Sequence, residues 1–412
     1  MDYDNTRYGG IKEYQGVDKM FDIDLIIPCY GRSELINRGL ASISTQWKKE
    51  YIHVTLVNDC SPNTDCNYQD LVDRYKNEID IRCITMPKNS GQGLTRQFGI
   101  DNTEHEWFMF MDEDDQFGNG LAVSIIVGAA EGYGLVLNPD GSYNVDKDGK
   151  PIYKEDRKNV ALVSAPLFEF DDHHTHVIES SNRIWLNSKL YNREFLNKHN
   201  IRFNKAQSRH AEDYYFMSCF FYALDNDADY MGILLDNEGL YYLWYPNEES
   251  QSRIDPHYGY MLSGYTMNGS VNILKYMKSR KSNVNQTKRT KEQYDKKLLN
   301  MTVYSYYTFL SFIRHVAETD YVPKLEDDWY ILRDSCNELR QMTKENFGKY
   351  SYIRKIEELY VVKNHSDVHF TEPWVTFDDY IMDGCKEFSY DFDDLIKCKK
   401  KYKFDKNGMR IK

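Results

Sequence analysis

Four short apolar runs, the first two rich in β-branched residues, alternate with polar or helical stretches near the start of the chain. The runs cover residues 23–28, 52–57, 81–86 and 107–111. Between the first two, the segment 34–46 places Leu35, Leu40 and Ile43 at helical spacing. Strands that alternate with helices in this way are typical of βαβ units, whose parallel sheet is buried on both faces. The sequence therefore predicts an α/β fold with a mainly parallel sheet.

The composition is that of a folded protein. Hydrophobic residues make up 41% and charged residues 28% of the chain, which excludes a mainly disordered or fibrous protein. The length of 412 residues suggests two or three domains. Eight cysteines stand at positions 29, 60, 66, 83, 219, 336, 385 and 398, without a CxxC pair. This spacing favours reduced thiols over a disulfide framework or a zinc site.

The sequence carries neither of the usual membrane signals. Its start has no basic and then apolar leader pattern, and no stretch approaches 18 uninterrupted apolar residues. We therefore expect a cytoplasmic protein without a membrane span.

The last third of the chain has a different texture. Beyond about residue 265 the periodicity becomes helical, most clearly in residues 298–317, and predicts a mostly helical region. Residues 275–297 hold nine Lys or Arg against two acids, and residues 397–412 hold eight against one. In a chain of net charge −12 these segments would attract an anionic partner, either nucleic acid or a membrane surface. Solvated helix faces and a frayed tail are the simpler interpretation.

Four consecutive acids, Asp112 to Asp115, directly follow the apolar run 107–111. In an open α/β sheet, ligands bind beyond the carboxyl ends of the strands, where this cluster is expected. Neighbouring carboxylates resist joint ionisation unless a cation lies among them. Oxygen ligands suit Mg²⁺ or Mn²⁺, which are commonly shared with substrate phosphates. A solvated acidic turn is the alternative, and the position after a buried strand favours the metal.

Three further features carry weaker signals. Gly91 and Arg96 follow the third apolar run, where glycine allows close approach of a ligand and arginine neutralises phosphate. Glu212 and Asp213 open an apolar helical run, where acids also serve as simple helix caps. Residues 172–176 contain three histidines, but such close spacing favours a polar loop over a zinc site.

These segments, in this order, resemble the family 2 glycosyltransferases of the GT-A fold. The resemblance runs from about residue 21 to 255 and rests on several ordered motifs. The motifs are IIPCYGRSELINRGLASISTQ, LVNDCSPN, NSGQGLTRQFGI, FMFMDEDDQF, RIWLNSKLYNREFLNKHNIRF, the pair Glu212-Asp213 and YYLWYPNEESQSR.

The resemblance implies a donor-binding set in the first half of the chain. Pro28 and Tyr30 would line the nucleobase pocket, and Asp59 matches the carboxylate that reads uracil. Asn58 stands where the family has a first Asp. The remaining members of the donor set are Gly91, with Arg96 approaching the diphosphate and Asp112 near the ribose.

It also implies metal, acceptor and catalytic positions. Asp114 would bind the metal together with Asp112, and His257 sits where some relatives place a further metal ligand. Lys189 and Glu212 would lie on the acceptor side, and Asp213 would be the catalytic base.

The domain organisation follows from the same comparison. We expect an extension over residues 1–20, a GT-A domain over 21–264 and a helical C-terminal domain with a basic tail over 265–412. Two Asp-Gly turns predict a surface hairpin inserted at about 138–158.

The sequence thus predicts an inverting glycosyltransferase that uses Mn²⁺ or Mg²⁺ and a nucleotide-sugar donor, most simply a UDP-sugar. The acceptor is a hydroxyl of a glycan, a lipid-linked sugar, a protein or a nucleic acid. Two alternatives stay open: a nucleotidyltransferase with a similar metal site, and a non-catalytic protein that binds carbohydrate or nucleic acid on the same scaffold.

Overall fold

The structure is a computed structural model of the 412-residue chain. The residues that it describes are 8–11, 21–62, 67–135, 144–147, 152–170, 175–205, 210–236, 239–245, 258–280, 338, 403–404 and 410–411. The chain divides into two compact units. The first comprises residues 1–209 and 216–248, and the second comprises residues 210–215 and 249–412.

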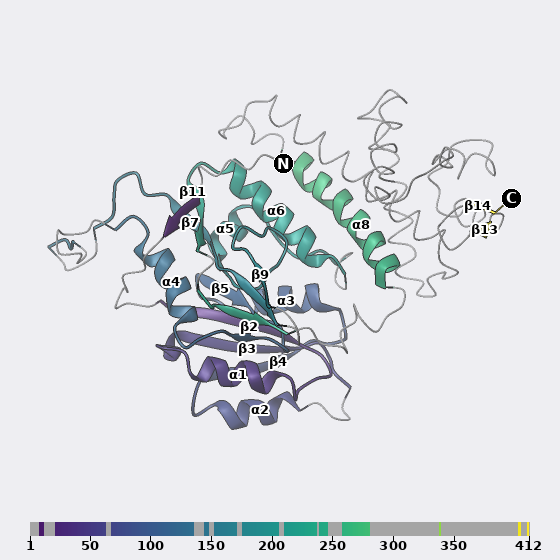
Figure 1. Cartoon of the computed structure of the whole chain (residues 1–412), viewed down its shortest axis with the longest axis horizontal. Coiled ribbons are helices and arrows are strands. Elements are labelled where there is room, and N and C mark those ends of the chain that lie inside the picture. The colour runs from purple at the N-terminus through teal and green to yellow at the C-terminus, as the bar shows by residue number, and fades with distance from the viewer. Residues whose placement is uncertain are drawn as a thin grey trace. The chain divides into compact units, whose positions relative to one another are not determined.

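A mixed sheet forms the centre of the first unit (Figure 1). Across the sheet, its described strands are β1 (Tyr8–Ile11), β11 (Tyr230–Leu235), β7 (Asn159–Ser164), β10 (Lys189–Asn192), β5 (Trp107–Phe110), β2 (Ile23–Cys29), β3 (Ile52–Asn58) and β4 (Asp80–Thr85). The four predicted runs are β2, β3, β4 and β5, and they pair in parallel. β10 runs antiparallel between β5 and β7. The predicted α/β class with a mixed, mainly parallel sheet is confirmed.

Helices cover both faces of this sheet, which explains why every residue of β2 is buried. On one face, α1 (Ile36–Ser44) buries Ile36, Leu40 and Ile43, three positions that fall on one side of a helix. The neighbouring α2 (Tyr68–Tyr75) begins at Asn67, whose side chain accepts two backbone N–H groups of the first turn. The opposite face is covered by α3 (Gln92–Asp101) (Figure 1).

A second sheet begins with a short strand that directly follows the acidic cluster along the chain. Its strands, in order, are β6 (Gln116–Phe117), β12 (Tyr242–Trp244), β8 (Leu167–Phe170) and β9 (Thr175–Ile178). β6 follows the four acids directly and pairs antiparallel with β12. This pairing brings residues near 242 to the acidic loop, although about 130 positions separate them in the chain.

The inserted segment after α4 (Ala122–Gly132) is described only in part. Leu135 and Tyr153 form an antiparallel bridge, and the N–H of Ile152 donates to the carbonyl of Asn144 at 2.8 Å. The predicted hairpin over 138–158 lies partly outside the described residues and stays a prediction.

Two of the described helices lie in the C-terminal half of the chain. α6 (Glu212–Asn226) begins in the second unit, and α8 (Tyr258–Ser279) lies within it and contains the predicted boundary at 264. The predicted helix over 298–317 and most of both basic segments lie outside the described residues. Among the described residues, no helix has both the length and the apolar character needed to cross a bilayer.

The contact between α3 and the sheet depends on Gly99. A Cβ at this position would overlap the Cγ2 methyl of Ile26 and lie 3.2 Å from Cγ2 of Val57. Gly99→Ala is therefore expected to destabilise the fold by about 1–3 kcal/mol, more than the helix gains from alanine. Thermal unfolding measures the change, with Asp101→Ala on the exposed surface of α3 as control. A variant as stable as the parent chain would contradict this packing.

Candidate functional site

Three neighbouring strands end at one edge of the sheet and bring together most of the residues singled out from the sequence. Because β2 lies between β3 and β5 and all three are parallel, their carboxyl ends share this edge. Tyr30 follows β2, Asp59 follows β3 and Asp112 follows β5. Contacts among the loops join these positions into one site.

The four acids after β5 alternate between two environments. Glu113 is 5% exposed and Asp115 is completely buried, whereas Asp112 and Asp114 are partly exposed. Asp112 and Asp114 are therefore the carboxylates of the cluster that a ligand can reach.

Glu113 ties the acidic loop to the loop after β2. Its carboxylate accepts the backbone N–H of Tyr30 at 3.1 Å and the Nε of Arg32 at 2.9 Å. The Tyr68 hydroxyl donates to the same carboxylate at 3.3 Å. Burial raises the pKa of Glu113 to about 7, although Arg32 opposes the shift. No sequence pattern assigned this role, because each partner comes from a segment more than 40 residues away.

Asp115 ties the same loop to β12. The Tyr242 hydroxyl donates to its carboxylate at 2.7 Å, and the N–H of Tyr245 lies 3.3 Å from its other oxygen. Burial, and then the two neighbouring aspartates, raise the pKa of Asp115 well above its usual value. The Tyr242 hydroxyl also accepts the N–H of Asp112 at 3.1 Å. Asp115 thus supports the loop.

Asp112 accepts hydrogen bonds from two side chains of α3 and from one in the segment before β10. Its Oδ1 accepts from Arg96 of α3 at 2.7 Å and from Gln92 at 3.2 Å, and its Oδ2 accepts from Asn187 at 2.9 Å. Arg96 is 3% exposed, so the arginine of this ion pair is buried in the protein. The structure therefore brings the predicted residues Arg96 and Asp112 together and adds Asn187, which had no predicted role.

Asp59 fixes the turn that starts α3. One carboxylate oxygen accepts the N–H of Ser90 at 2.7 Å, and the other accepts the N–H of Gly91 at 2.8 Å. Gly91 has a φ of 84°, a conformation that glycine adopts without strain. Cys60, next to Asp59, has a φ of 56°, which is strained for a residue with a side chain. The sequence pointed to Asp59 and Gly91 separately, and the structure joins them.

Lys189 is the first residue of β10 and is 2% exposed. It pairs with Ser164 of β7 and follows Ser188, whose φ of 59° is again in the left-handed region. Burial lowers the pKa of Lys189 to about 7. The amine therefore gains or loses its proton near physiological pH.

The predicted base lies in the second unit. Glu212 and Asp213 are the first residues of α6, and the N–H of Tyr214 donates to the Asp213 carboxylate at 2.6 Å. His257 lies outside the described residues. The roles of Asp213, Glu212 and His257 stay predictions.

The family model for glycosyl transferase family 2 matches residues 24–211, which include the sheet edge and the acidic cluster. Residues 24–211, a little under half of the chain, thus match glycosyltransferase family 2. This family assignment favours a glycosyltransferase over the nucleotidyltransferase alternative.

Two curated relatives each match a little under half of the chain. The succinoglycan biosynthesis protein ExoO of Rhizobium meliloti is 24% identical over 199 residues, 48% of this chain and 55% of the relative. The GalNAc(5)-diNAcBac-PP-undecaprenol beta-1,3-glucosyltransferase of Campylobacter jejuni is 22% identical over 179 residues, 42% of this chain and 55% of the relative. The chain thus spans about half the length of either relative.

A solved structure supports the fold. The crystal structure of S. aureus TarS 1–349 in complex with UDP-GlcNAc superposes with a TM-score of 0.54 at 14% identity, over 84% of this chain and 92% of that chain. The expected GT-A-like fold is therefore confirmed.

The buried amine of Lys189 predicts a pH dependence of stability. Its pKa is about 7 in the folded chain against an ordinary value of 10.5, so between these values the unfolded chain binds more protons. Stability should therefore rise with pH across this window, and Lys189→Met should remove the rise and stabilise the chain near pH 7. Thermal unfolding from about pH 6 to pH 10 measures it, with exposed Lys76→Met as control. Parallel pH profiles for Lys189→Met and the parent would contradict the assignment.

Proposed function

We propose that the protein is a metal-dependent, inverting glycosyltransferase that moves a sugar from a UDP-sugar to an acceptor hydroxyl. The observation that carries the proposal is the alternation in the acidic cluster. Two carboxylates are buried and hold the loop, and two are partly exposed, of which Asp112 pairs with the buried Arg96. A family 2 domain places its donor at such a strand end, as the sequence resemblance implies.

The accessible acids fit a hard divalent cation. Asp112 and Asp114 offer only oxygen atoms, the ligands that Mn²⁺ and Mg²⁺ prefer. When bound there, the ion would neutralise charge that develops on the leaving diphosphate. Arg96, which pairs with Asp112 at 2.7 Å, supplies a fixed positive charge for the same purpose.

Asp213 is proposed as the general base. It would take the proton of the acceptor hydroxyl while that oxygen attacks the anomeric carbon from the face opposite the diphosphate. A single displacement inverts the configuration at that carbon. Two observations support Asp213 as the base. The Glu212-Asp213 pair resembles that of the family, and the pair lies at the start of α6.

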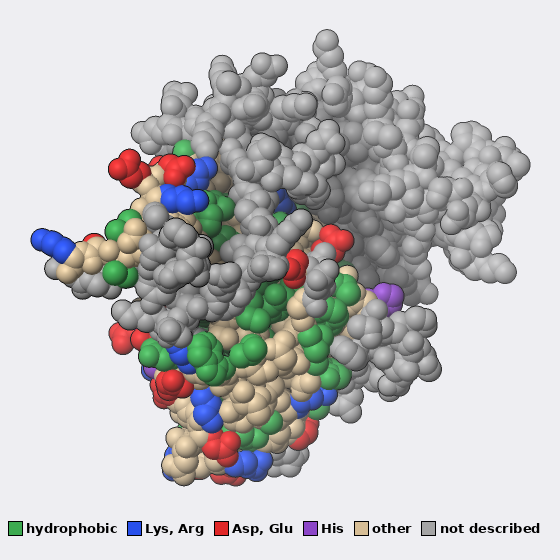
Figure 2. Space-filling model, turned by 60° about the vertical axis from the view of Figure 1, so that its left-hand side comes forward, with side chains coloured by type: hydrophobic (Ala, Val, Ile, Leu, Met, Phe, Trp, Pro, Cys, Tyr) green, Lys and Arg blue, Asp and Glu red, His purple; other side chains and the backbone are tan. Residues whose placement is uncertain are grey.

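A glycan or lipid-linked glycan is the proposed acceptor. One relative is named a glucosyltransferase of an undecaprenol-linked glycan, and the other a succinoglycan biosynthesis protein. Neither name points to a nucleic acid acceptor. On the face in Figure 2, the described Lys and Arg side chains are interspersed with Asp and Glu and form no single basic field there.

The metal assignment predicts a selective loss in Asp114→Ala. UDP binding should weaken when Mn²⁺ is present and stay unchanged without it, because only the metal-bridged part of the affinity depends on this carboxylate. Calorimetric titration of UDP with and without Mn²⁺ measures both. Asp115→Asn is the matched control, since its amide oxygen can still accept from Tyr242. Equal losses with and without metal would reject Asp114 as a ligand.

The base assignment predicts a loss of transfer without a loss of donor binding. Asp213→Asn keeps the shape of the side chain but cannot accept the proton, so acceptor-dependent UDP release should fall by about 10²- to 10⁴-fold. UDP release from UDP-GlcNAc, UDP-glucose and UDP-galactose is measured with a panel of glycan acceptors. Asp225→Asn near the other end of α6 is the control. Turnover retained in Asp213→Asn would remove this residue from the mechanism.

A further inference from the structure

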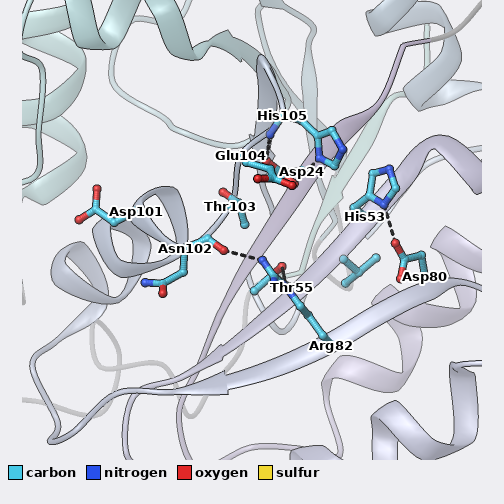
Figure 3. Close-up of a pocket in the computed structure, with 11 residues that line it drawn as sticks. Asp24, His53, Thr55, Asp80, Arg82, Asp101, Asn102, Thr103, Glu104 and His105 are labelled. Atoms are coloured by element: carbon cyan, nitrogen blue, oxygen red, sulfur yellow. Dashed lines mark hydrogen bonds and ion pairs between the residues drawn. The ribbon is translucent and has the colours of Figure 1, made fainter.

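The opposite edge of the main sheet carries a second cluster of titratable side chains that the proposed function does not use. Asp22 and Asp24 lie at the start of β2, His53 at the start of β3, and His105 just before β5. Figure 3 shows Asp24, His53 and His105. Parallel strands put these amino ends at the edge away from Asp112 and Asp114. A pocket of about 480 Å³ lies beside the cluster.

His53 lies between two carboxylates. Its Nδ1 is 2.5 Å from Asp80, which begins β4, and its Nε2 is 2.8 Å from Asp22. The Asp80 carboxylate therefore fixes the ring from one side and leaves Nε2 directed at Asp22. Asp22 has a half-exposed side chain, so its carboxylate is open to an ion from solution.

His105 is held in the same manner. Its Nδ1 is 2.7 Å from Asp24, a buried carboxylate that also pairs with Arg193 at 2.9 Å. The His105 ring stacks on His53 with centroids 4.2 Å apart and planes 16° from parallel. Figure 3 shows the two rings side by side, each next to its carboxylate. Histidines that bind metals characteristically have one ring nitrogen hydrogen-bonded to a carboxylate, which leaves the other for the ion.

We propose that Asp22, His53 and His105 bind one transition-metal ion of the Zn²⁺ class at the amino edge of the sheet. One ligand atom from each of the three lies within 4.8 Å of the other two. Because Nδ1 of each ring is bound to a carboxylate, the ligands would be the two Nε2 nitrogens and a carboxylate oxygen of Asp22. Solvent completes the coordination, as at zinc sites with three protein ligands.

Binding requires a small rearrangement. With metal–ligand bonds of about 2.1 Å, tetrahedral ligand atoms lie roughly 3.4 Å apart, so the three groups must draw together. The lone pair of an imidazole lies in the plane of its ring, so one of the stacked rings must turn to face the ion. The adjoining pocket has room for that turn. The ion replaces the proton between His53 Nε2 and Asp22, and this proton is released to solvent.

The ligand chemistry distinguishes this ion from the one at the acidic cluster. Two imidazole nitrogens favour Zn²⁺ or a similar ion over Mg²⁺ and Mn²⁺, which prefer oxygen. The surroundings also favour a cation. Asp24, Asp80, Asp101 and Glu104 line the pocket, against the single arginine Arg82. Bound here, the ion would join the starts of β2 and β3 to the loop before β5.

The test is metal titration of the full chain without a histidine tag, after treatment with a chelator. Zn²⁺ binding is measured by calorimetry, and Co²⁺ binding by its visible absorption. We expect one ion per chain at this site, lost in the double variant His53→Gln/His105→Gln. The matched control replaces His173, His174 and His176 with Gln, because that run could bind Zn²⁺ by itself, and it should retain the ion. Loss of the ion in this control and not in the double variant would overturn the proposal.

A second variant covers the case in which the double variant does not fold. Asp22→Asn changes a half-exposed ligand, so the fold should persist while Zn²⁺ affinity falls at least tenfold. Unchanged affinity in Asp22→Asn would also overturn the proposal. Mn²⁺-dependent binding of UDP is recorded for every variant and should stay at the parent value, so that failure of this site is separate from failure of the donor site.

Discussion

The buried carboxylates of Glu113 and Asp115 are the constraint on which the site depends. Glu113 holds the loop after β2 through Tyr30 and Arg32, and Asp115 holds β12 through Tyr242. Burying carboxyl groups is costly, as the raised pKa of each one indicates. The hydrogen bonds offset part of that cost. These contacts fix the backbone of the acidic loop, in which Asp112 and Asp114 stay partly exposed.

The sequence predicted the frame of the molecule better than the contacts within it. β2, β3 and β5 were readable because strands buried on both faces are continuous apolar runs, and α1 because its apolar residues recur at helical spacing. The same reasoning placed Asp112 beyond the carboxyl end of a strand, whereas Asp59 was singled out only by the family resemblance. It did not find the roles of Glu113 or Asn187, since each depends on partners brought near by the fold. The pair His53 and His105 escaped for the same reason, being 52 positions apart with no motif around them.

The two edges of the sheet carry different chemistry for a common geometrical reason. Parallel strands align their ends, so polar residues placed just outside the apolar runs gather in two clusters. At the carboxyl edge the accessible groups are carboxylates with Arg96, which suits a hard cation and a diphosphate. At the amino edge they are imidazoles backed by Asp24 and Asp80, which suits a softer ion. One fold thus separates two ligand preferences without a second domain.

Two carboxylates at the carboxyl edge of the sheet, those of Asp59 and Asp112, hold the first turns of α3. Asp59 accepts the N–H groups at the start of the helix, and Asp112 pairs with Arg96 one turn later. Both oxygens of the Asp59 carboxylate are used in holding Ser90 and Gly91. Arg96 is different, because its ion pair with Asp112 competes directly with an arriving diphosphate. Under the proposed function, donor binding therefore exchanges one partner of Arg96 for another, which frees Asp112 for the ribose or the metal and makes the two events interdependent.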